Sequence, residues 1–433
     1  MFSCQLSDLI RPDRIHRDVY VSDAVYEQER ERLWKRAWVY AGHVSQIPNA
    51  GDYITVDIAG DPLVLVRRHD GTVHGLRNRC AHKGARLVSA PSGNVGKVFR
   101  CPYHAWTYRT DGSLLAPPRR EGYAGTDFPT CDAAKGIAPV PGLACHRGFV
   151  FVRLSQDGPS FDAYAGTEVL RALDHLADRS PSGELEVAGG CLRTVIRANW
   201  KLYLENINDA MHPVTAHASA SEAAFAVWNA HPEGSPPPMA MQQLLPFGSG
   251  YDFYDGIGAR VLPNGHSILG TRSSLHVSYA DLPEYEPAMI TAHGAERTRE
   301  ILSFTPQNVI LYPGLSFKAS PQALRVIRPL GADRTVIEAW SFRPKRAPAA
   351  LLQRAALYNR LVFSPMSVVA HDDIHLFESI QQAVKTDGNP WISLHRNFVA
   401  SDRDDETRDV GGMDEALMRN QYRAWRQWVG SDG

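Results

Sequence analysis

The sequence lacks the features of a membrane or exported protein. Its longest apolar runs, such as PLVLV (62–66) and GFVFV (148–152), are far shorter than the roughly 20 residues that a transmembrane helix needs. The N-terminal stretch MFSCQLSDLIRPDR contains no apolar core of the length found in signal peptides. We therefore expect a cytoplasmic protein that has no contact with membranes.

An excess of charge of one sign is also missing. The 433 residues include 46 basic and 47 acidic side chains, which gives a formal net charge of -1. Proteins that bind nucleic acid usually carry a basic surface, so this balance argues against a nucleic-acid partner. Cysteine is scarce as well, because six cysteines in a chain of this length do not make a disulfide framework. We expect a protein that acts on small molecules and keeps its cysteines reduced.

Two of those cysteines stand beside histidines with the spacing of a metal site. Cys80-x-His82 is followed, after 18 residues, by Cys101-x2-His104. Thiolates combined with imidazoles bind zinc or an iron–sulfur cluster. A structural zinc site usually pairs cysteine with cysteine and histidine with histidine, whereas here each half supplies one of each, as in the Rieske 2Fe–2S centre. We predict that these four residues hold a Rieske cluster, with structural zinc as the alternative.

The region around these motifs predicts an all-β domain. Apolar and β-branched runs are divided by turn signals such as Asp70-Gly71, which indicates consecutive antiparallel strands. We expect a compact domain over residues 42–157, preceded by an N-terminal helical segment, residues 1–41, with its helix at 24–39. The strands are predicted within residues 53–76, 97–101, 106–115 and 148–154.

Residues 158–433 form the second predicted domain, of the α+β class, and the N-terminal segment is expected to pack on it. A strand leads into a helix that begins near Asn199, and a hairpin is predicted at 323–342. A stretch rich in Ala, Gly, Pro and Met, 221–250, predicts a loop over a pocket. Further helices are predicted at 348–363, 366–384 and 414–430, the last of which could cover this domain or a partner.

A second candidate metal site lies in NWKLYLENINDAMHPVTAH (199–217). Asp209 and His212 are three residues apart and share a helix face. His217 is five residues beyond His212, about 140° around an ideal helix, so a straight helix could not aim both imidazoles at one ion. Pro213 resolves this conflict, because its ring clashes with the carbonyl of Asp209 and forces the segment to kink between the two histidines.

A third ligand is expected from AHDDIHLFESIQ (370–381), where Asp372 and Asp373 begin a helical stretch. Either carboxylate could join His212 and His217 in a 2-His-1-carboxylate triad with open positions, which is typical of non-haem Fe(II) oxygenases. The alternative is that the two aspartates only cap the helix and complement its dipole.

The order of these motifs resembles the catalytic α subunit of the Rieske non-haem iron aromatic ring-hydroxylating oxygenases. The resemblance implies a helix-grip (START-like) α+β catalytic domain, with a large antiparallel sheet and a long C-terminal helix, beside the all-β Rieske domain. It spans roughly residues 25–385 and rests, besides the Rieske motif, on N-W-K (199–201), E-N-x2-D-x2-H-x4-H (205–217) and D-x4-E-x2-Q (373–381).

Site residues and cofactors follow from this resemblance. It implies that His212, His217 and Asp373 bind a mononuclear Fe(II), and the spacing to Gln381 favours Asp373 over Asp372. It implies O2 as co-substrate and electrons that pass from NAD(P)H through a reductase, with or without a ferredoxin, to the Rieske cluster.

The resemblance also implies an assembly. Family members form head-to-tail trimers in which the donor cluster belongs to the neighbouring subunit, so a homotrimer α3, or α3β3 with a small β subunit, is expected. Asp209 matches the acidic residue that bridges the two centres. Its implied task is to accept hydrogen bonds from His212 and from His104 of the neighbour.

We expect the terminal component that inserts oxygen into an aromatic substrate, with an aromatic carboxylate as the preferred class. A monooxygenase for demethylation or side-chain hydroxylation is the first alternative. A Rieske electron-transfer protein with no oxygen chemistry is the second. The residues considered for an apolar pocket are Phe225, Trp228, Phe304 and Phe317, and those considered as partners of a carboxylate are Arg260 and Asn308.

Overall fold

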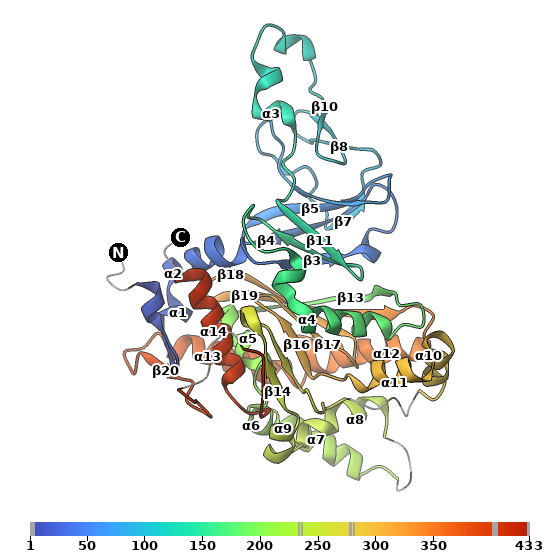
Figure 1. Ribbon diagram of the computed structural model, residues 1–433, viewed down its shortest axis with the longest axis vertical. Coiled ribbons are helices and arrows are strands. Elements are labelled where there is room, and N and C mark those ends of the chain that lie inside the picture. Colours follow the sequence, from blue (N-terminus) through green and yellow to red (C-terminus); the bar gives the residue numbers. More distant parts are fainter. Residues whose placement is uncertain are drawn as a thin grey trace. The chain divides into compact units, whose positions relative to one another are not determined.

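A computed structural model describes residues 5–232, 234, 237–276, 279, 282–400 and 406–430. The chain forms two compact units, Trp34–Phe161 on the one hand and the segments up to Leu33 and from Asp162 on the other (Figure 1). The first unit encloses the predicted range 42–157 and begins earlier, because Val39–His43 is a strand of this unit and not part of an N-terminal helix. Within the described part, no helix combines the length and apolarity needed to cross a bilayer.

The unit Trp34–Phe161 is built from three small antiparallel sheets, with strand orders β6-β5-β4-β7, β10-β9-β8 and β11-β12-β3. The expected all-β Rieske fold is confirmed. Its strands are β3 (Val39–His43), β4 (Asp52–Ile58), β5 (Asp61–Arg67), β6 (Val73–Arg77), β7 (Ser92–Asn94), β8 (Val98–Arg100), β9 (Thr107–Arg109), β10 (Leu114–Ala116), β11 (Gly142–His146) and β12 (Phe149–Arg153).

The second unit is organised around an eight-stranded antiparallel sheet in the order β13-β19-β18-β17-β16-β15-β14-β21. The predicted hairpin at 323–342 is confirmed by the pairing of β18 with β19. The strands of this sheet are β13 (Leu185–Ile196), β14 (Ala259–Val261), β15 (Ser267–Leu269), β16 (Asn308–Leu311), β17 (Leu315–Lys318), β18 (Ala323–Gly331), β19 (Arg334–Pro344) and β21 (Arg408–Val410).

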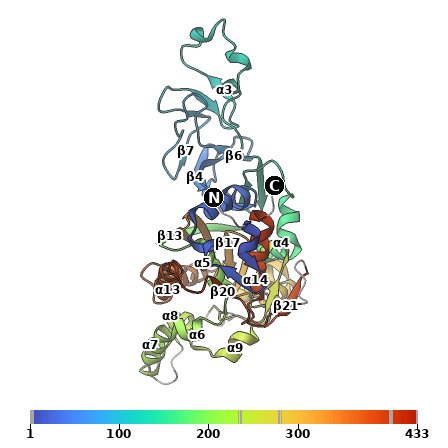
Figure 2. The ribbon, with the colours of Figure 1, turned by 90° about the vertical axis from the view of Figure 1, so that its left-hand side faces the viewer.

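Helices cover both faces of this sheet, and Figure 2 shows α4 and α13 on opposite sides of it. This arrangement confirms the α+β class with a large antiparallel sheet. The longer helices are α2 (Asp23–Glu29), α4 (Phe161–Asp178), α5 (Trp200–Ile207), α7 (Ala218–Asn229), α10 (Tyr285–His293), α11 (Ala295–Ser303), α12 (Ala349–Tyr358), α13 (Ala370–Ala383) and α14 (Ala416–Val429).

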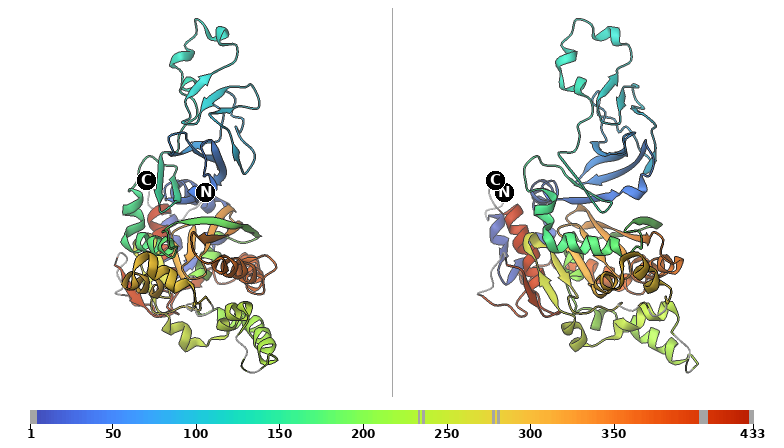
Figure 3. Two further views of the ribbon diagram at one scale, coloured as in Figure 1. Left: turned by 90° about the vertical axis from the view of Figure 1, so that its right-hand side faces the viewer. Right: turned by 45° about the vertical axis from the view of Figure 1, so that its right-hand side comes forward.

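Two secondary-structure predictions are wrong. The described part of 221–250 is mostly helical and not a loop, because it contains most of α7, then α8 (Met239–Leu244) and a 3-10 turn, in the yellow-green region of Figure 3. Alanine is the strongest helix former, and the alanine-rich start of this stretch lies in α7. The helix predicted at 24–39 ends at Trp34, where a π-helical turn closes it.

Both ends of the chain pack on the second unit around one buried carboxylate. Glu29, at the end of α2, is fully buried and accepts hydrogen bonds from Trp200 Nε1 (2.8 Å), Lys201 Nζ (2.5 Å) and Trp425 Nε1 (2.7 Å). Trp200 and Lys201 belong to the N-W-K motif, and Trp425 lies in α14. The motif therefore anchors the N-terminal helix and the final helix beside α5, and the final helix covers this unit.

Candidate active site

The predicted His212–His217 motif lies where helix α5 ends and the short helix α6 (Pro213–Ala216) begins. The side chain of Asn199 caps α5 by accepting a hydrogen bond from the N–H of Lys201 (3.1 Å). Pro213 is the first residue of α6, where its missing N–H leaves no gap in the helix. Helix α5 ends at Ile207, before Asp209, so the break lies ahead of His212 and not between the two histidines, where the kink is predicted, and Asp209 and His212 do not share a helix. The segment from Asn208 to His212 forms this break. It brings the two imidazole rings to a centroid distance of 5.4 Å.

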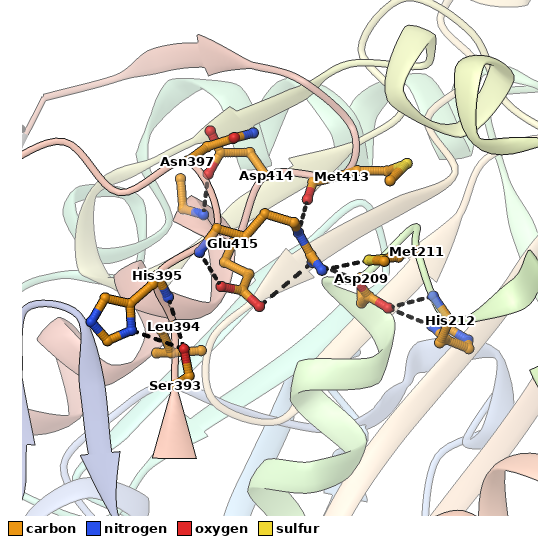
Figure 4. Close-up of polar contacts among 12 residues, drawn as sticks. Asp209, Met211, His212, Ser393, Leu394, His395, Asn397, Met413, Asp414 and Glu415 are labelled. Atoms are coloured by element: carbon orange, nitrogen blue, oxygen red, sulfur yellow. Dashed lines mark hydrogen bonds and ion pairs between the residues drawn. The ribbon is translucent and has the colours of Figure 1, made fainter. Parts of the chain in front are cut away.

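Asp209 fixes the orientation of the His212 ring (Figure 4). Its Oδ2 accepts hydrogen bonds from the backbone N–H of His212 (2.7 Å) and from Nδ1 of the ring (2.9 Å). A ring that donates from Nδ1 has its lone pair on Nε2. That Nε2 accordingly accepts from the side-chain amide of Asn206 (3.0 Å). Burial opposes the charge of Asp209, but the hydrogen bonds from His212 keep its pKa below the usual value.

The Nε2 atoms of both histidines converge on one carboxylate oxygen. Oδ1 of Asp373 lies 3.4 Å from Nε2 of His217 and 3.7 Å from Nε2 of His212. One ligand atom from each of the three residues lies within 4.8 Å of the other two. Two imidazole nitrogens and one carboxylate oxygen suit a divalent transition metal, and three protein ligands leave positions open. The donor set therefore fits the mononuclear iron that the sequence predicts.

Asp372 lies beside the other nitrogen of His217. Its Oδ2 is 3.6 Å from Nδ1 of His217, and neither of these buried atoms has a hydrogen-bond partner among the described residues. Burial, helped by the charge of His212, lowers the pKa of His217 to about 4, so this imidazole is neutral at neutral pH, as a metal ligand must be. Burial raises the pKa of Asp373 to about 6.

Helix α13, which carries Asp373, is tied to the start of α5. Gln381 accepts a hydrogen bond from the N–H of Asn199 (3.0 Å), and Glu378 accepts one from the N–H of Arg197 (3.1 Å). The Glu378 carboxylate also pairs with the guanidinium of Arg197 at 3.2 Å. These contacts fix α13 relative to α5 and so hold Asp373 opposite the two histidines.

The triad opens into a cavity with about 510 Å³ of empty space. Its aromatic lining comes from Phe247, Tyr254, Tyr358 and Phe363, joined by aliphatic side chains. A cavity with a mostly apolar wall and a few converging polar groups is typical of small-molecule sites. The cavity lies on one face of the sheet. This is the face where the segment after α5 and helix α13 place the triad residues.

None of the four aromatic residues considered for the pocket is part of its lining. Phe317 points to the other face of β17, because side chains alternate along a strand, and it is fully buried in the core. Phe225 is exposed on α7. The other two, Trp228 and Phe304, are half-buried away from the cavity.

The two predicted partners of a carboxylate have different outcomes. Arg260 does not line the cavity. It forms ion pairs with Asp409 (2.7 Å) and Glu168 (3.1 Å) at the edge of the sheet. Its prediction as a partner of the substrate carboxylate is therefore wrong. Asn308 does line the cavity. Its role as the partner of a carboxylate stays a prediction.

Two cationic residues of the cavity were missed from the sequence. Lys318, at the end of β17, and Arg325, in β18, both line the cavity and are 4% and 3% exposed. The signal that could have found them is a charged residue inside an apolar strand, in LSFK (315–318) and in ALRVI (323–327). Such a residue is almost never fully buried without a partner.

The unit Trp34–Phe161 holds the four predicted cluster ligands in two similar turns. The carbonyl of Cys80 accepts a hydrogen bond from the N–H of Gly84 (2.9 Å), and the carbonyl of Cys101 accepts one from the N–H of Ala105 (3.0 Å). Both cysteines are buried, at 3% exposure. No disulfide joins the five cysteines in the described part of the chain, and Cys4 lies outside the described residues.

Tyr108 supports the first of these turns. Its hydroxyl lies 3.1 Å from Sγ of Cys80 and 3.1 Å from the N–H of Ala81. Because the hydroxyl accepts from that N–H, its own proton is available to the sulfur. Burial opposes thiolate formation at Cys80, but the bond from Tyr108 and the neighbouring N–H groups keep its pKa below the usual value.

The histidines of the two turns lie next to each other. The ring centroids of His82 and His104 are 4.8 Å apart, and the His82 ring stacks on Trp106 at 4.9 Å. The Nδ1 of His82 is buried and has no hydrogen-bond partner within the described residues. An orphaned imidazole nitrogen beside two buried thiols fits a 2Fe–2S cluster with mixed ligands. The ring of His104 is exposed.

Comparisons with known proteins agree with both sites. Residues 37–129 match the Rieske [2Fe-2S] domain, and residues 173–431 match the ring hydroxylating alpha subunit (catalytic domain). The chain is 30% identical to biphenyl 2,3-dioxygenase subunit alpha of Rhodococcus jostii, over 96% of this chain and 88% of the relative. It is 28% identical to N,N-dimethyl phenylurea N-demethylase subunit alpha of a Sphingobium species, over 96% and 90%.

A solved structure shows the same fold. Naphthalene 1,2-dioxygenase from a Rhodococcus species, bound to indole, superimposes with a TM-score of 0.76 at 24% identity, over 97% of this chain and 95% of that one. Oxygenases of this type use a Rieske 2Fe–2S cluster, a mononuclear iron, O2 and electrons that a reductase supplies. The chain belongs to the ring-hydroxylating alpha subunit family of Rieske non-haem iron oxygenases.

Proposed function

We propose that this protein is the terminal oxygenase that inserts oxygen from O2 into a small aromatic acid. The observation that supports this most is the convergence of His212, His217 and Asp373 at the wall of an apolar cavity of about 510 Å³. Three protein ligands leave coordination positions open, and the cavity can accept a ring next to them. An oxygenase needs both features in one place.

In this proposal the triad binds the iron, and Cys80, His82, Cys101 and His104 bind the cluster. When bound, the cluster supplies single electrons and the iron supplies open positions for O2. Neighbouring side chains orient the ligand residues of these sites.

Asp209 and Asn206 prepare the triad. Asp209 accepts the Nδ1–H of His212 and thereby keeps the lone pair on Nε2. Asn206 donates to that Nε2 (3.0 Å) and to Oδ1 of Asp373 (3.1 Å), so the two ligand atoms face the same point before any ion is bound. The apolar lining excludes water, which strengthens the electrostatic interactions inside the cavity.

The proposal includes the assembly implied by the sequence, a head-to-tail homotrimer, alone or with a small β subunit. In it, Asp209 would also accept a hydrogen bond from His104 of the neighbouring subunit. The exposed ring of His104 supports this, because such a ring can reach another chain. The relatives are named as alpha subunits, which is compatible with a β subunit.

The proposed reaction is dioxygenation of the ring. An arene, O2, two electrons and two protons give a cis-dihydrodiol, so two C–O bonds form, the O–O bond breaks and one aromatic double bond is lost. The electrons come from NAD(P)H through a reductase, with or without a ferredoxin. Both oxygen atoms remain in the product.

Demethylation is the second candidate, and the similarity to a phenylurea N-demethylase favours it. An N-methyl group, O2, two electrons and two protons then give the free N–H, formaldehyde and water. One oxygen atom leaves as water. Both reactions use the same triad and differ in which part of the substrate faces it.

The test is turnover of the Fe(II)-loaded protein with a reductase, NADH and 18O2, using a panel of aromatic acids and N-methyl aromatics. Two labelled oxygen atoms in the product support dioxygenation, and formaldehyde formed in equal amount with the demethylated amine supports demethylation. Reduction of the cluster without any O2-dependent product, on the full panel, would contradict both and favour an electron carrier. Zinc without acid-labile sulfide would point to the structural zinc alternative.

A further inference from the structure

Strands β17 and β18 place two cations on the cavity face of the sheet. Their register pairs Ser316 with Arg325 and Lys318 with Ala323. Because side chains alternate along a strand, Ser316, Lys318 and Arg325 share one face, and both cations line the cavity that contains the triad. Diagonal positions on neighbouring strands are roughly 7–8 Å apart, which lets two long side chains reach one small anion.

Neither basic residue is in contact with an acid among the described residues, although the charge of Arg325 acts on Asp373 and opposes the rise that burial causes in the pKa of that carboxyl. Lys318 and Arg325 are 4% and 3% exposed, yet within the described part of the chain neither forms an ion pair with a carboxylate. Lys201 provides the contrast, since it is equally buried but is paired with Glu29 at 2.5 Å. Burying an unpaired charge is costly, so such residues are normally paired.

The acids of the cavity are already engaged. Asp209 bonds to the ring of His212 (2.9 Å) and to the guanidinium of Arg396 (3.2 Å), and Asp373 belongs to the triad. These are the two acidic residues in the lining of the cavity among the described residues. The cavity therefore offers the guanidinium of Arg325 and the amine of Lys318, which can take up a proton, and no spare negative group of its own among the described residues.

The side chain of Arg325 is held in place, and one of its N–H groups still lacks a hydrogen-bond acceptor among the described residues. Its Nη2 donates to Oγ of Ser316 (2.9 Å) and to Oδ1 of Asn308, and its guanidinium lies over the ring of Phe363 at 4.6 Å. Its buried Nε has no hydrogen-bond partner among the described residues. A guanidinium that is fixed by packing loses little entropy when it binds a carboxylate.

The side chain of Lys318 has fewer polar contacts than that of Arg325. Its Nζ lies 5.8 Å from the centre of the Tyr358 ring, which is its one cation–π contact among the described residues, and it makes no hydrogen bond there. Burial, followed by the charge of Arg325, places the pKa of Lys318 well below the usual value for lysine. An anion beside the amine would reverse both effects and restore its charge.

We propose that Lys318 and Arg325 form the recognition site for the carboxylate of the aromatic acid that this enzyme oxidises. The inference rests on the proposed oxygenase function and adds the groups that select the substrate. The carboxylate lies against the cavity face of β17 and β18, and the ring contacts the aromatic lining. A neutral hydrocarbon would leave the guanidinium of Arg325 buried without an acid and could not restore the charge of Lys318, so the site discriminates against it.

The first test is anaerobic binding calorimetry on the metal-loaded full-length protein. Benzoate, 2-aminobenzoate, salicylate and phthalate are each compared with the corresponding amide. We expect at least one acid to bind about 30-fold more tightly than its amide, the effect of a buried charge pair. Equal or weaker binding of all the acids, or no binding of any acid, would overturn the proposal.

Lys318→Met should lower the affinity for the preferred acid by about 30-fold and leave that of the amide unchanged. The matched control is Lys385→Met, because Lys385 is half exposed and pairs with Asp333 outside the cavity. An unchanged preference for the acid in Lys318→Met would contradict the assignment.

Proton uptake gives a readout that needs no variant. If Lys318 regains its charge on binding, calorimetry in two buffers of different ionisation enthalpy will show up to one proton taken up with the acid and none with the amide. No uptake at any pH from 7 to 9, together with equal affinities, would refute the site even if Lys318→Met does not fold.

These outcomes separate the two proposals. If acids bind selectively but no oxygenated product forms, the carboxylate site stands and the oxygenase function fails. If neutral aromatics are oxygenated and acids are neither bound nor oxidised, the oxygenase activity stands, whereas the aromatic acid as its substrate and the carboxylate site both fail.

Discussion

The two candidate metal sites of this chain are built in opposite ways. Cys80, His82, Cys101 and His104 lie within 25 residues of sequence, on two turns with matching backbone hydrogen bonds. The triad joins the 212–217 segment to Asp373, more than 150 residues later, and it depends on the docking of α13 against α5. A site made of short local turns can be predicted from spacing, whereas a site assembled by tertiary contacts shows only part of itself in the sequence.

The two sites also differ in their contact with solvent. The ring of His104 is exposed, whereas that of His217 is 1% exposed and lies at the wall of an apolar cavity. An exposed imidazole suits a centre that exchanges electrons with other proteins. A buried triad suits chemistry from which water must be excluded.

The sharpest test of this comparison removes one ligand from each site. Cys101→Ser should abolish the visible absorption of the cluster and leave the mononuclear iron bound, whereas His217→Ala should do the reverse. Turnover should fall to background in both variants, because the reaction needs both the cluster and the mononuclear iron. Iron and acid-labile sulfide analysis, together with the absorption spectrum, measures the effect. His231→Ala, which removes an exposed histidine, is the control.

If either substitution alone removes both the cluster and the mononuclear iron, the two sites do not bind their metals independently. A His217→Ala protein with normal turnover would favour the electron-carrier alternative.

The second prediction concerns the two neighbouring aspartates. Asp373→Asn should lose the mononuclear iron and turnover, because Oδ1 of Asp373 is the atom on which both histidines converge. Asp372→Asn should keep the metal and lose about tenfold in metal affinity, since Asp372 faces only Nδ1 of His217. Metal titration of both variants measures this, and the opposite order of effects would assign the ligand to Asp372.

The sequence could predict what depends on residue spacing. The paired Cys-His turns and the hairpin at 323–342 follow from local rules, and the structure has the hairpin. The interruption of the helix is also present, but it begins after Ile207 and Pro213 starts the next helix, so its predicted position is wrong. Asp373 could be preferred over Asp372 only through the family pattern. The structure supplies the physical reason, because Gln381 and Glu378 fix α13 so that Asp373 faces the histidines.

The substrate end of the cavity could not be predicted in this way. Which face of β17 meets the cavity depends on the register of the whole sheet, so Phe317 looks as suitable as Lys318 in the sequence. Arg260 looks like a free cation until its partners Asp409 and Glu168 are known. Tertiary pairing decides both cases. The charge inside the apolar strand LSFK marks Lys318 as unusual, but it does not show which face of the strand meets the cavity.

The third prediction tests the link between the two sites. Asp209→Ala should reduce turnover by about 10–100-fold while both metals stay bound, because it removes the group that orients His212 and the proposed acceptor for His104 of the neighbour. Single-turnover kinetics, with the cluster reduced in advance, would show slow reoxidation of the cluster. Rapid reoxidation with slow product formation would limit the role of Asp209 to orienting His212.

The fourth prediction is a pH dependence at the substrate end. The groups that face Lys318 or share its surroundings are Arg325 from β18, Tyr358 and Arg354 from α12, and His276. None is an acid. Burial lowers the pKa of His276 to about 3, so it stays neutral.

Because the pKa of Lys318 is depressed, its charge is lost as the pH rises through a value below the usual one. The KM for the acid should then rise, by up to about tenfold per pH unit. The KM for a neutral analogue should stay constant, and Lys318→Met should abolish the trend. A parallel rise for acid and neutral analogue would place the titrating group elsewhere.

The smallest effect is expected at Arg396, which supports Asp209 from the side away from His212. Its guanidinium donates to Oδ1 of Asp209 (3.2 Å) and to the carbonyl of Met413 (2.6 Å), and Glu415 accepts a hydrogen bond from its backbone N–H (2.8 Å) (Figure 4). The side chain is 30% exposed, so its ion pair with Asp209 is screened and worth no more than about 1 kcal/mol. Arg396→Gln should therefore lower turnover by about fivefold at most, with the metals retained, whereas Arg86→Gln, at an exposed pair with Asp57, should have no effect. A loss as large as that of Asp209→Ala would mean that Oδ1 of Asp209, and not its bond to His212, determines electron delivery.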